Sequence, residues 1–342
     1  MTRAPRPPMG IATPTSAYNK QRYKHYLDHY STGYGEAARQ AVHHYFDDNA
    51  QVKMGHPINE AHGASGYIQA FLDPLANAFA GLQRQDYIVI GGEYLGSQWV
   101  TSTGYFYGHF KQPLFGIPPT NKMGFLRYGE FLRIENDVVV EAECYLGLAE
   151  LIIAIGRWPL GDSKGYEGVV PGPATHDGIN LNEPTTQSSQ ASATLVEDML
   201  MGLASEDKAW RPYWSDNMVW YGPGGFGTYA TVDAFEAFQV PFEKCFQGWG
   251  DGQNEGLSGI GSSCKAGDGN YAFLSGWPQI TGIHVRPFLG IEPTGKRVYM
   301  RDCDWWRCEN GTIIENWCML DTLHLALQLG RDVLAEVSSQ RL

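Results

Sequence analysis

The chain lacks the features that mark nucleic-acid-binding and membrane proteins. Only 18% of its 342 residues are charged, the net charge is −12, and lysine and arginine form no cluster, whereas phosphate binding needs a concentrated basic surface. No apolar run approaches the roughly 18 residues of a transmembrane helix, and the N-terminal segment has no apolar core long enough for a signal peptide. We therefore expect no nucleic-acid partner, no membrane association and a cytoplasmic location.

The chain also has little that indicates a metal or a redox centre. None of its six cysteines forms a C-x-x-C pair, so a zinc or redox motif is unsupported. His56, Glu60 and His62 lie in a segment with a proline and flanking glycines, which predicts a loop rather than an H-E-x-x-H helix. We expect reduced, packed thiols, no metal and no cofactor.

The chain does contain a long internal repeat. Residues 114–156 read LFGIPPTNKMGFLRYGEFLRIENDVVVEAECYLGLAELIIAIG, and residues 288–330 read FLGIEPTGKRVYMRDCDWWRCENGTIIENWCMLDTLHLALQLG. Gly116 aligns with Gly290, an offset of 290 − 116 = 174, and the same offset relates Lys122 to Lys296 and Cys144 to Cys318. This period is far longer than the roughly 20–50 residues of solenoid units, so each copy is expected to be a complete domain.

The domain boundaries follow from composition. We predict a first domain at residues 18–160 and a second at residues 192–337. Residues 161–191 lose all periodicity and concentrate Gly, Pro, Ser, Thr and Gln, which is typical of a linker. Residues 1–17 are rich in proline and threonine and are expected to form a loose arm.

Both copies show the same order of predicted elements. Helices come first, four strands follow, and a helix closes each copy. The expected strands lie at 86–94, 99–110, 123–134 and 138–146, and again at 256–266, 271–280, 298–307 and 312–320. Alternation in the third strand places Arg127 and Phe131 on one face and Tyr128 and Glu130 on the other. This order predicts an α+β fold rather than alternating βαβ units.

Short motifs in both copies resemble the SnoaL-like polyketide cyclase branch of the nuclear-transport-factor-2-like superfamily. Copy one has GIPPT at 116–120 with Arg133 and Asn136, and copy two has GIEPTG at 290–295, MR at 300–301, WR at 306–307, NG at 310–311, IENW at 314–317 and QLG at 328–330. The resemblance covers about 280 residues and is strongest in the C-terminal half of each copy.

This resemblance implies two tandem cone-shaped α+β barrels, each a curved antiparallel sheet wrapped by helices around a deep apolar pocket. Such domains dimerise through their sheets, so the copies are expected to form an internal pseudo-dimer, and the chain itself is a possible homo-oligomer. Relatives include cyclases, dehydratases, isomerases and epoxide hydrolases as well as binding-only modules, and they typically need no cofactor. Fold alone therefore does not define the reaction.

The resemblance also implies positions for a pocket acid and base. The family's histidine on the penultimate strand falls by position on Glu130 in copy one and Asp304 in copy two. Its last-strand aspartate falls on Cys144 and Cys318, which are departures from the family pattern. Asp321 matches a second acidic position, where copy one has glycine. Copy two therefore retains more potential chemistry.

Alternation on the strand at 298–307 places Asp302, Asp304 and Trp306 on one face. A carboxylate beside tryptophan in an apolar cone is expected to have a raised pKa, and a second carboxylate nearby raises one of the two further. Such a group can act as a general acid or base near neutral pH. The alternative is that Asp304 forms a structural ion pair with Arg301 or Arg307.

The predicted catalytic residues are Asp304, Asp321, His284 and Glu130. His284 and its rough counterpart His109 either point into the cones to assist proton transfer or are hydrogen-bonded rim residues. Cys318 has no histidine partner placed by the sequence, which favours a packed thiol over a nucleophile. The candidate substrate-binding residues are Tyr221, Trp277, Asp302, Trp306, Trp317, Cys318, Tyr128 and His109, although core packing explains any one of the aromatic residues as well.

Together these patterns predict a cofactor-free acid/base enzyme that acts on a hydrophobic or aromatic small molecule, as a cyclase, dehydratase, isomerase or hydrolase, chiefly in the second domain. The alternative is a non-catalytic small-molecule-binding or scaffolding protein in which copy one is a structural mate. The state of Asp304 separates the two hypotheses, because a carboxylate without an arginine partner favours catalysis.

Overall fold

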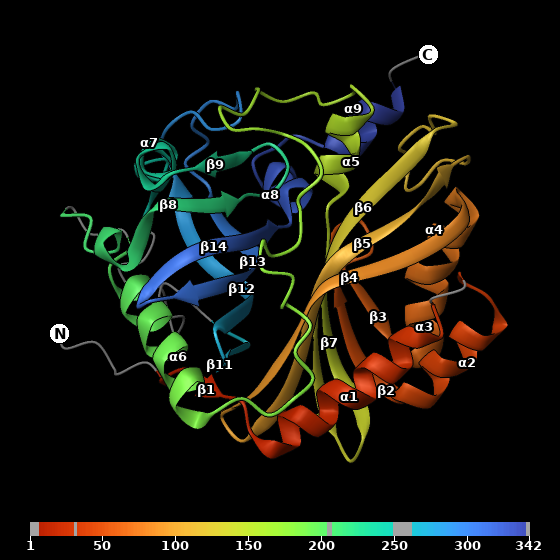
Figure 1. Cartoon of the computed structure of the whole chain (residues 1–342). Helices are drawn as coiled ribbons and strands as arrows, with labels where there is room; N and C mark the ends of the chain where they lie inside the picture. The colour runs from red at the N-terminus through yellow and green to blue at the C-terminus, as the bar shows by residue number, and fades with distance from the viewer. Residues whose placement is uncertain (1–6, 31–32, 204–206, 249–261, 340–342) are drawn as a thin grey trace.

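A computed structural model describes residues 7–30, 33–203, 207–248 and 262–339. The chain forms two α+β halves, each built on a strongly curved, mainly antiparallel sheet with helices packed on it (Figure 1). The predicted fold class of two tandem cone-shaped α+β barrels is confirmed.

The first half begins with helices and ends with a four-stranded antiparallel region and a closing helix. Its elements are α1 (Pro14–Asp28), α2 (Glu36–Tyr45), β2 (Phe46–Met54), β3 (Glu60–His62), α3 (Gly63–Tyr67), a π-helical turn (Ile68–Leu72), α4 (Asp73–Ala78), β4 (Phe79–Tyr94), β5 (Ser97–Phe110), β6 (Met123–Glu135), β7 (Val138–Leu146) and α5 (Leu148–Ala154). All four predicted strands are present, and β4 begins at Phe79 rather than at residue 86.

The second half repeats this order. Its elements are α6 (Thr186–Met201), a 3₁₀ turn (Arg211–Tyr213), β8 (Trp214–Tyr221), β9 (Thr228–Ala230), α7 (Val232–Glu243), β10 (Phe246–Gln247), β11 (Cys264–Asp268), β12 (Tyr271–His284), β13 (Arg297–Glu309), β14 (Thr312–Leu320), α8 (Thr322–Gln328) and α9 (Val333–Ser339). Of the strand expected at 256–266, residues 256–261 lie outside the described residues, and the remainder contains the start of β11.

The N-terminal segment is not a loose arm where it is described. Residues Gly10–Ile11 form β1, which pairs with β11 in parallel and with β4 through Ile11 and Glu93. A side chain at position 10 would collide with the backbone, because an added Cβ would lie 1.6 Å from the Glu93 carbonyl oxygen. Thr13 then caps α1 by accepting a hydrogen bond from the Ser16 amide. The arm therefore joins the sheets of the two halves.

The linker is shorter than predicted. Helix α6 begins at Thr186, inside the segment expected to be a linker, because the Thr185 side chain accepts a hydrogen bond from the Ser188 amide and caps the helix. The preceding residues run along the surface of both halves (Figure 1). Tyr166 exchanges backbone hydrogen bonds with Thr228, and the Val89 amide donates to the Gly178 carbonyl oxygen.

The two sheets pack against each other through the faces that point away from the cones. Phe131 and Trp305 stack across the junction with ring centroids 5.0 Å apart. Gly129 permits this approach, since an added Cβ would lie 2.5 Å from the Trp305 ring. A buried ion pair between Lys20 and Asp268, 2.7 Å long, adds a second link between the halves. This arrangement is the predicted internal pseudo-dimer.

Among the described residues, no helix is both long and apolar enough to span a bilayer.

Candidate functional site

The second cone places a pair of carboxylates on its inner wall. Asp302, Asp304 and Trp306 alternate along β13, and the last of them belongs to the apolar cluster that fills the cone. Across the ladder, Asp304 pairs with Cys318 of β14 and Trp306 pairs with Asn316. The predicted facing of these three residues agrees with this register.

Asp304 is surrounded by protein and is not neutralised by a cation. Burial raises its pKa to about 6, and hydrogen bonds from Asn316 and Cys318 partly offset that rise. The Asn316 Nδ2 donates to Oδ1 at 2.9 Å. The residue nevertheless keeps some accessible surface between the buried neighbours Cys303 and Trp305, which means that open space adjoins it.

The arginines that the alternative hypothesis paired with Asp304 lie elsewhere. Strand alternation places Arg301 and Arg307 on the opposite face of β13. Arg301 lies 3.3 Å from Asp321, and Arg307 lies 2.5 Å from Glu315. No described residue forms an ion pair with Asp304.

Asp302 is the more deeply buried member of the pair. Burial raises its pKa well above the ordinary value, and the nearby Asp304 charge adds to the rise. Among the described residues, neither its Oδ1 nor the indole Nε1 of Trp306 has a hydrogen-bond partner. Buried polar atoms are normally paired, so a bound molecule with a polar atom could satisfy these two.

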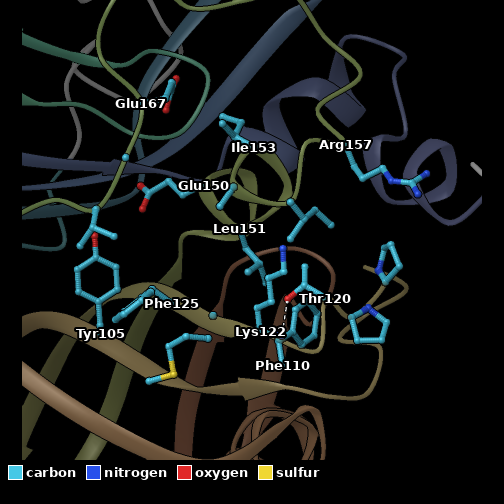
Figure 2. Close-up of a pocket in the computed structure, with 18 residues that line it drawn as sticks. Tyr105, Phe110, Thr120, Lys122, Phe125, Glu150, Leu151, Ile153, Arg157 and Glu167 are labelled. Carbon is cyan, nitrogen blue, oxygen red and sulfur yellow. Dashed lines mark hydrogen bonds between the residues drawn. The ribbon is translucent and has the colours of Figure 1, made fainter. Parts of the chain in front are cut away.

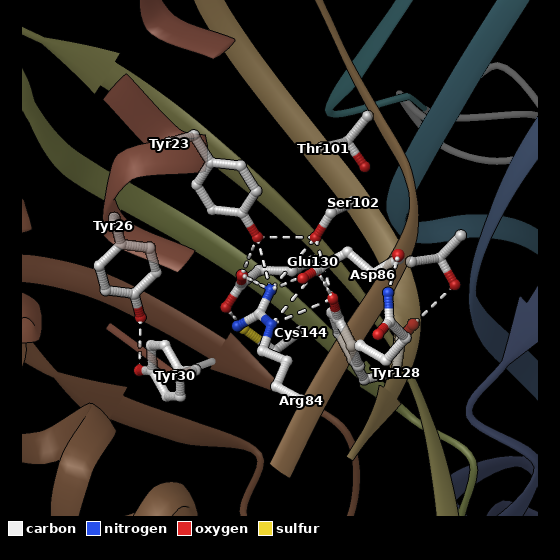
Figure 3. A network of polar contacts seen from close by, with 12 residues as sticks. Tyr23, Tyr26, Tyr30, Arg84, Asp86, Thr101, Ser102, Tyr128, Glu130 and Cys144 are labelled. Atoms are coloured by element: carbon white, nitrogen blue, oxygen red, sulfur yellow. Dashed lines mark hydrogen bonds and ion pairs between the residues drawn. The ribbon is translucent and has the colours of Figure 1, made fainter. Parts of the chain in front are cut away.

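The first cone differs because its carboxylate is fully paired (Figure 3). Glu130 accepts hydrogen bonds from the hydroxyls of Tyr23 and Tyr67, each at 2.7 Å, and lies 3.0 Å from the Arg84 guanidinium. Arg84 also contacts Asp86, which accepts a hydrogen bond from Tyr128. The predicted catalytic residue Glu130 thus lies in a buried ion-pair network. Tyr128, a predicted substrate-binding residue, belongs to the same network.

Asp321 lies at the junction of the two halves rather than beside Asp304. It caps α8 by accepting a hydrogen bond from the His324 amide at 3.2 Å, and it accepts another from the His56 amide of the first half at 2.8 Å. Together with the Arg301 ion pair, these contacts occupy its carboxylate. The geometry describes a residue that positions the two halves.

His284 is buried, but far from the carboxylate pair. Its amide donates to the Lys296 carbonyl oxygen, and from Lys296 the chain runs six residues to Asp302 and eight to Asp304, or about 20 Å and 26 Å at 3.3 Å per residue. The ring Nδ1 accepts a hydrogen bond from the Thr294 amide at 3.2 Å, while Nε2 has no partner in the part of the chain that the structure describes. Its rough counterpart His109 is exposed and does not point into the first cone.

Three of the predicted pocket walls lie between the sheets. Tyr221 and Trp317 stack with centroids 5.4 Å apart, and both belong to the apolar cluster at the junction. Trp277 packs on Tyr145 of the first half and under the Arg301 guanidinium. All three aromatic side chains therefore pack at the junction between the sheets instead of lining a cone.

Cys318 faces the second cone beside Asp304, as expected. Burial raises the pKa of its thiol well above the ordinary value, and the neighbouring carboxylates add to the rise. Since the thiolate is the nucleophilic form, the structure supports the packed thiol.

One group of residues was missed by the sequence analysis. Glu150, Glu167 and Lys122 line a cavity of about 640 Å³ outside the cones (Figure 2). A signal was present, because Glu150 is the one charged residue in the apolar run LAELIIAI at 148–155. Glu150 alone does not indicate a site, because the sequence does not show that the linker residue Glu167 lies on the same cavity.

Comparison with known proteins supports the family resemblance. The family model described as SnoaL-like polyketide cyclase matches residues 277–329. No curated protein gives a significant match.

Solved structures with similarity to this chain cover about two fifths of it. AclR, a putative hydroxylase from Streptomyces galilaeus, is 18% identical over 42% of this chain and 98% of its own, with a TM-score of 0.34. A putative SnoaL-like polyketide cyclase from Jannaschia sp. CCS1 is 18% identical over 43% and 97%, with a TM-score of 0.36. IdmH, a putative polyketide cyclase from Streptomyces antibioticus, is 9% identical over 40% and 98%, with a TM-score of 0.34. The resemblance to the SnoaL-like polyketide cyclases, predicted from the motifs, is confirmed by the match to the family model in the second half of the chain.

Proposed function

We propose that the second half performs cofactor-free acid–base chemistry on a hydrophobic or aromatic small molecule, as a cyclase, dehydratase, isomerase or hydrolase. The observation that carries this proposal is the Asp302–Asp304 pair, which faces an apolar cone without a cationic partner among the described residues. The family match in residues 277–329 supports a reaction of this class.

The two carboxyls would divide the work because their surroundings separate their pKa values. Asp304 is ionised above about pH 6 and would remove a proton from the bound molecule as general base. Asp302, which retains its proton more strongly, would donate that proton or a hydrogen bond to the substrate oxygen on which negative charge develops. Asn316 orients Asp304 through Oδ1, and Trp306 excludes water from the reacting atoms.

An activated benzisoxazole tests this role without knowledge of the natural substrate. When a base removes its ring C–H proton, the electron pair of that bond forms the nitrile and the N–O bond breaks. The ring opens to a single coloured product, a cyanophenolate. We expect turnover by the full chain to rise with pH to a plateau, with a midpoint at about pH 6. Removing the general base in Asp304→Asn should lower the rate by about 10²–10⁴-fold.

Glu309→Gln is the matched control, because Glu309 lies on the same strand but is exposed. It should retain the full rate and the same pH midpoint. Unchanged turnover by Asp304→Asn would remove Asp304 from the proposal, and a midpoint near pH 4 would remove the desolvated environment on which the proposal depends.

The competing function is non-catalytic binding or scaffolding, and one observation favours it for the first half. The carboxylate of that cone is fully satisfied by tyrosine and arginine partners, which suits a structural mate. If native mass spectrometry finds a hydrophobic molecule retained by the wild type and by Asp304→Asn alike, while neither variant reacts with the probe, binding without catalysis is the better description of the whole chain.

A further inference from the structure

The cavity outside the cones is formed by four parts of the chain. Strands β5 and β6 form its floor, helix α5 and the loop at 118–122 form two walls, and linker residues 167–169 form the last (Figure 2). Its volume of about 640 Å³ lies within the roughly 300–1,000 Å³ of small-molecule sites. The cavity is therefore large enough to bind a molecule of two or three rings.

Most of the cavity lining is apolar and partly aromatic. Tyr105 and Phe125 meet edge to face with centroids 5.9 Å apart. Phe110, Leu151 and Ile153 extend the apolar surface toward the loop. Flat, apolar ligands fit walls of this kind.

One end of the cavity carries an excess negative charge. Glu150 lies 2.7 Å from the buried Arg127, so that pair is neutral. Glu167 accepts a hydrogen bond from the Gly225 amide at 2.9 Å and forms no ion pair within the described part of the chain. At this end of the cavity two carboxylates face one guanidinium, whereas the other cationic side chains of the lining, Lys122 and Arg157, lie away from Glu167 (Figure 2).

We propose that this cavity is a second ligand site, which binds a small aromatic molecule carrying a protonated amine, with the ammonium between Glu150 and Glu167 and the ring system on Tyr105 and Phe125. Charge complementarity selects the cation, because the Glu167 carboxylate is partly desolvated and has no cationic partner in the described part of the chain. The aromatic ring faces near the carboxylates add an attraction for an ammonium group. Lys122, at the opposite wall, is exposed and solvated, so it demands no ligand charge.

The titration of Glu150 supports this assignment. Burial raises the pKa of Glu150 to about 7, opposed by Arg127 and reinforced by Glu167, and burial also raises the pKa of Glu167. A bound ammonium would hold Glu150 ionised and so release a proton. Binding should therefore strengthen as pH rises through 7.

The cavity is lined by the first half and the linker, and the residue equivalent to Glu150 in the second half is not acidic. Glu167 is part of the linker, which Tyr166 fastens to Thr228 through backbone hydrogen bonds of 3.0 and 2.8 Å. The position equivalent to Glu150 is 150 + 174 = 324, which is His324.

Calorimetric titration of the full chain with naphthylethylamine, and with the neutral naphthylethanol as the matched probe, tests the proposal. At pH 8 we expect the amine to bind at least tenfold more tightly than the alcohol. Its affinity should fall about tenfold between pH 8 and pH 6, since the ionised fraction of a group with a pKa of about 7 falls by that factor. Equal affinity of the two probes would overturn the proposal.

Variants assign the binding to this cavity. Glu167→Gln should weaken amine binding at least tenfold while leaving the alcohol unaffected, and Glu150→Gln should in addition abolish the pH dependence. Glu150→Gln removes the partner of buried Arg127 and can unfold the chain, so Glu167→Gln, in a partly exposed segment, is the decisive variant. Asp304→Asn should bind the amine as the wild type does, which separates this site from the proposed catalytic one. Unchanged amine binding by Glu167→Gln would overturn the assignment.

Discussion

Glu130 and Asp304 occupy the same place in the two halves, yet their surroundings are opposite. The offset of 174 relates them, and both face a cone from the middle of a long strand. The residue across the ladder is Ser102 beside Glu130 and Leu274 beside Asp304. The residue two positions earlier is a tyrosine, Tyr128, in the first half and an aspartate in the second.

These exchanges replace hydroxyl donors with an apolar side chain and a second acid. In the first cone, hydroxyls and a guanidinium surround the carboxylate and compensate for its burial. In the second cone, Leu274 and Asp302 do not stabilise the negative charge of Asp304. Under the proposed function, the first half would contribute stability and the second would keep groups whose pKa values suit proton transfer, since perturbed pKa values cluster at functional sites.

Substituting Glu130 gives the largest expected effect on this comparison. In Glu130→Gln, Arg84 loses one of its two carboxylate partners inside the core, and Arg84 is itself almost completely buried. We expect the free energy of unfolding to fall by about 3 kcal/mol, at the low end for a broken buried pair because Asp86 remains. Urea denaturation of the full chain measures this value.

Glu135→Gln is the control for that loss. Glu135 ends the same strand and pairs with Arg133 at the surface, so its substitution should change stability by less than about 1 kcal/mol. If Glu130→Gln were as mild as this control, the first cone would not be the structural one.

Substituting Asp304 should have the opposite sign. Its folded-state pKa of about 6 exceeds the ordinary value of about 3.9, so folding favours the protonated form. The stability contribution of this group is fully present below pH 4 and is lost as pH rises through about 6. Asp304→Asn should therefore be more stable than the wild type at pH 7, by up to about 3 kcal/mol.

The pH dependence identifies the cause. The stability difference between Asp304→Asn and the wild type should be smallest near pH 4 and should grow up to about pH 7, whereas Glu309→Gln should show no such growth. A loss of stability at pH 7 in Asp304→Asn would mean that Asp304, like Glu130, is held by favourable partners, and the contrast between the cones would disappear.

Part of this contrast could be predicted from the sequence. The period-two alternation of strand 298–307 was sufficient to place Asp302, Asp304 and Trp306 together, because a strand offers only two faces. The alternation does not show which face of the strand points into the cone and which points toward the junction between the sheets. Both faces are apolar, and Trp305 and Trp317 are buried at the junction as completely as any residue in the cones.

Long-range contacts account for the remainder. Ile11 pairs with Glu93 and Gly267. A strand of two residues is too short to show the alternation from which strands are predicted. The helix that begins at Thr186 was hidden by a composition of Ser, Thr and Gln that also suits a linker. Tyr23 and Tyr67 reach Glu130 from helices far away in the chain, so a satisfied carboxylate and a free one have the same sequence signature.

The histidine counterparts give the smallest expected effects and a final contrast between the halves. His284 is buried and hydrogen-bonded to Thr294, so His284→Ala should lower the free energy of unfolding by about 1–2 kcal/mol. His109→Ala should change it by less than about 0.5 kcal/mol, as exposed substitutions do.

Burial lowers the pKa of His284, and the unfolded chain takes up a proton near pH 6.5. The wild type therefore loses stability as pH falls below that value, and urea denaturation at pH 7 and pH 5 should show the cost of His284→Ala shrinking toward the lower pH. A cost that is equal at both pH values would mean that the His284 ring has the same pKa in the folded and the unfolded chain, as a ring that faces water would have.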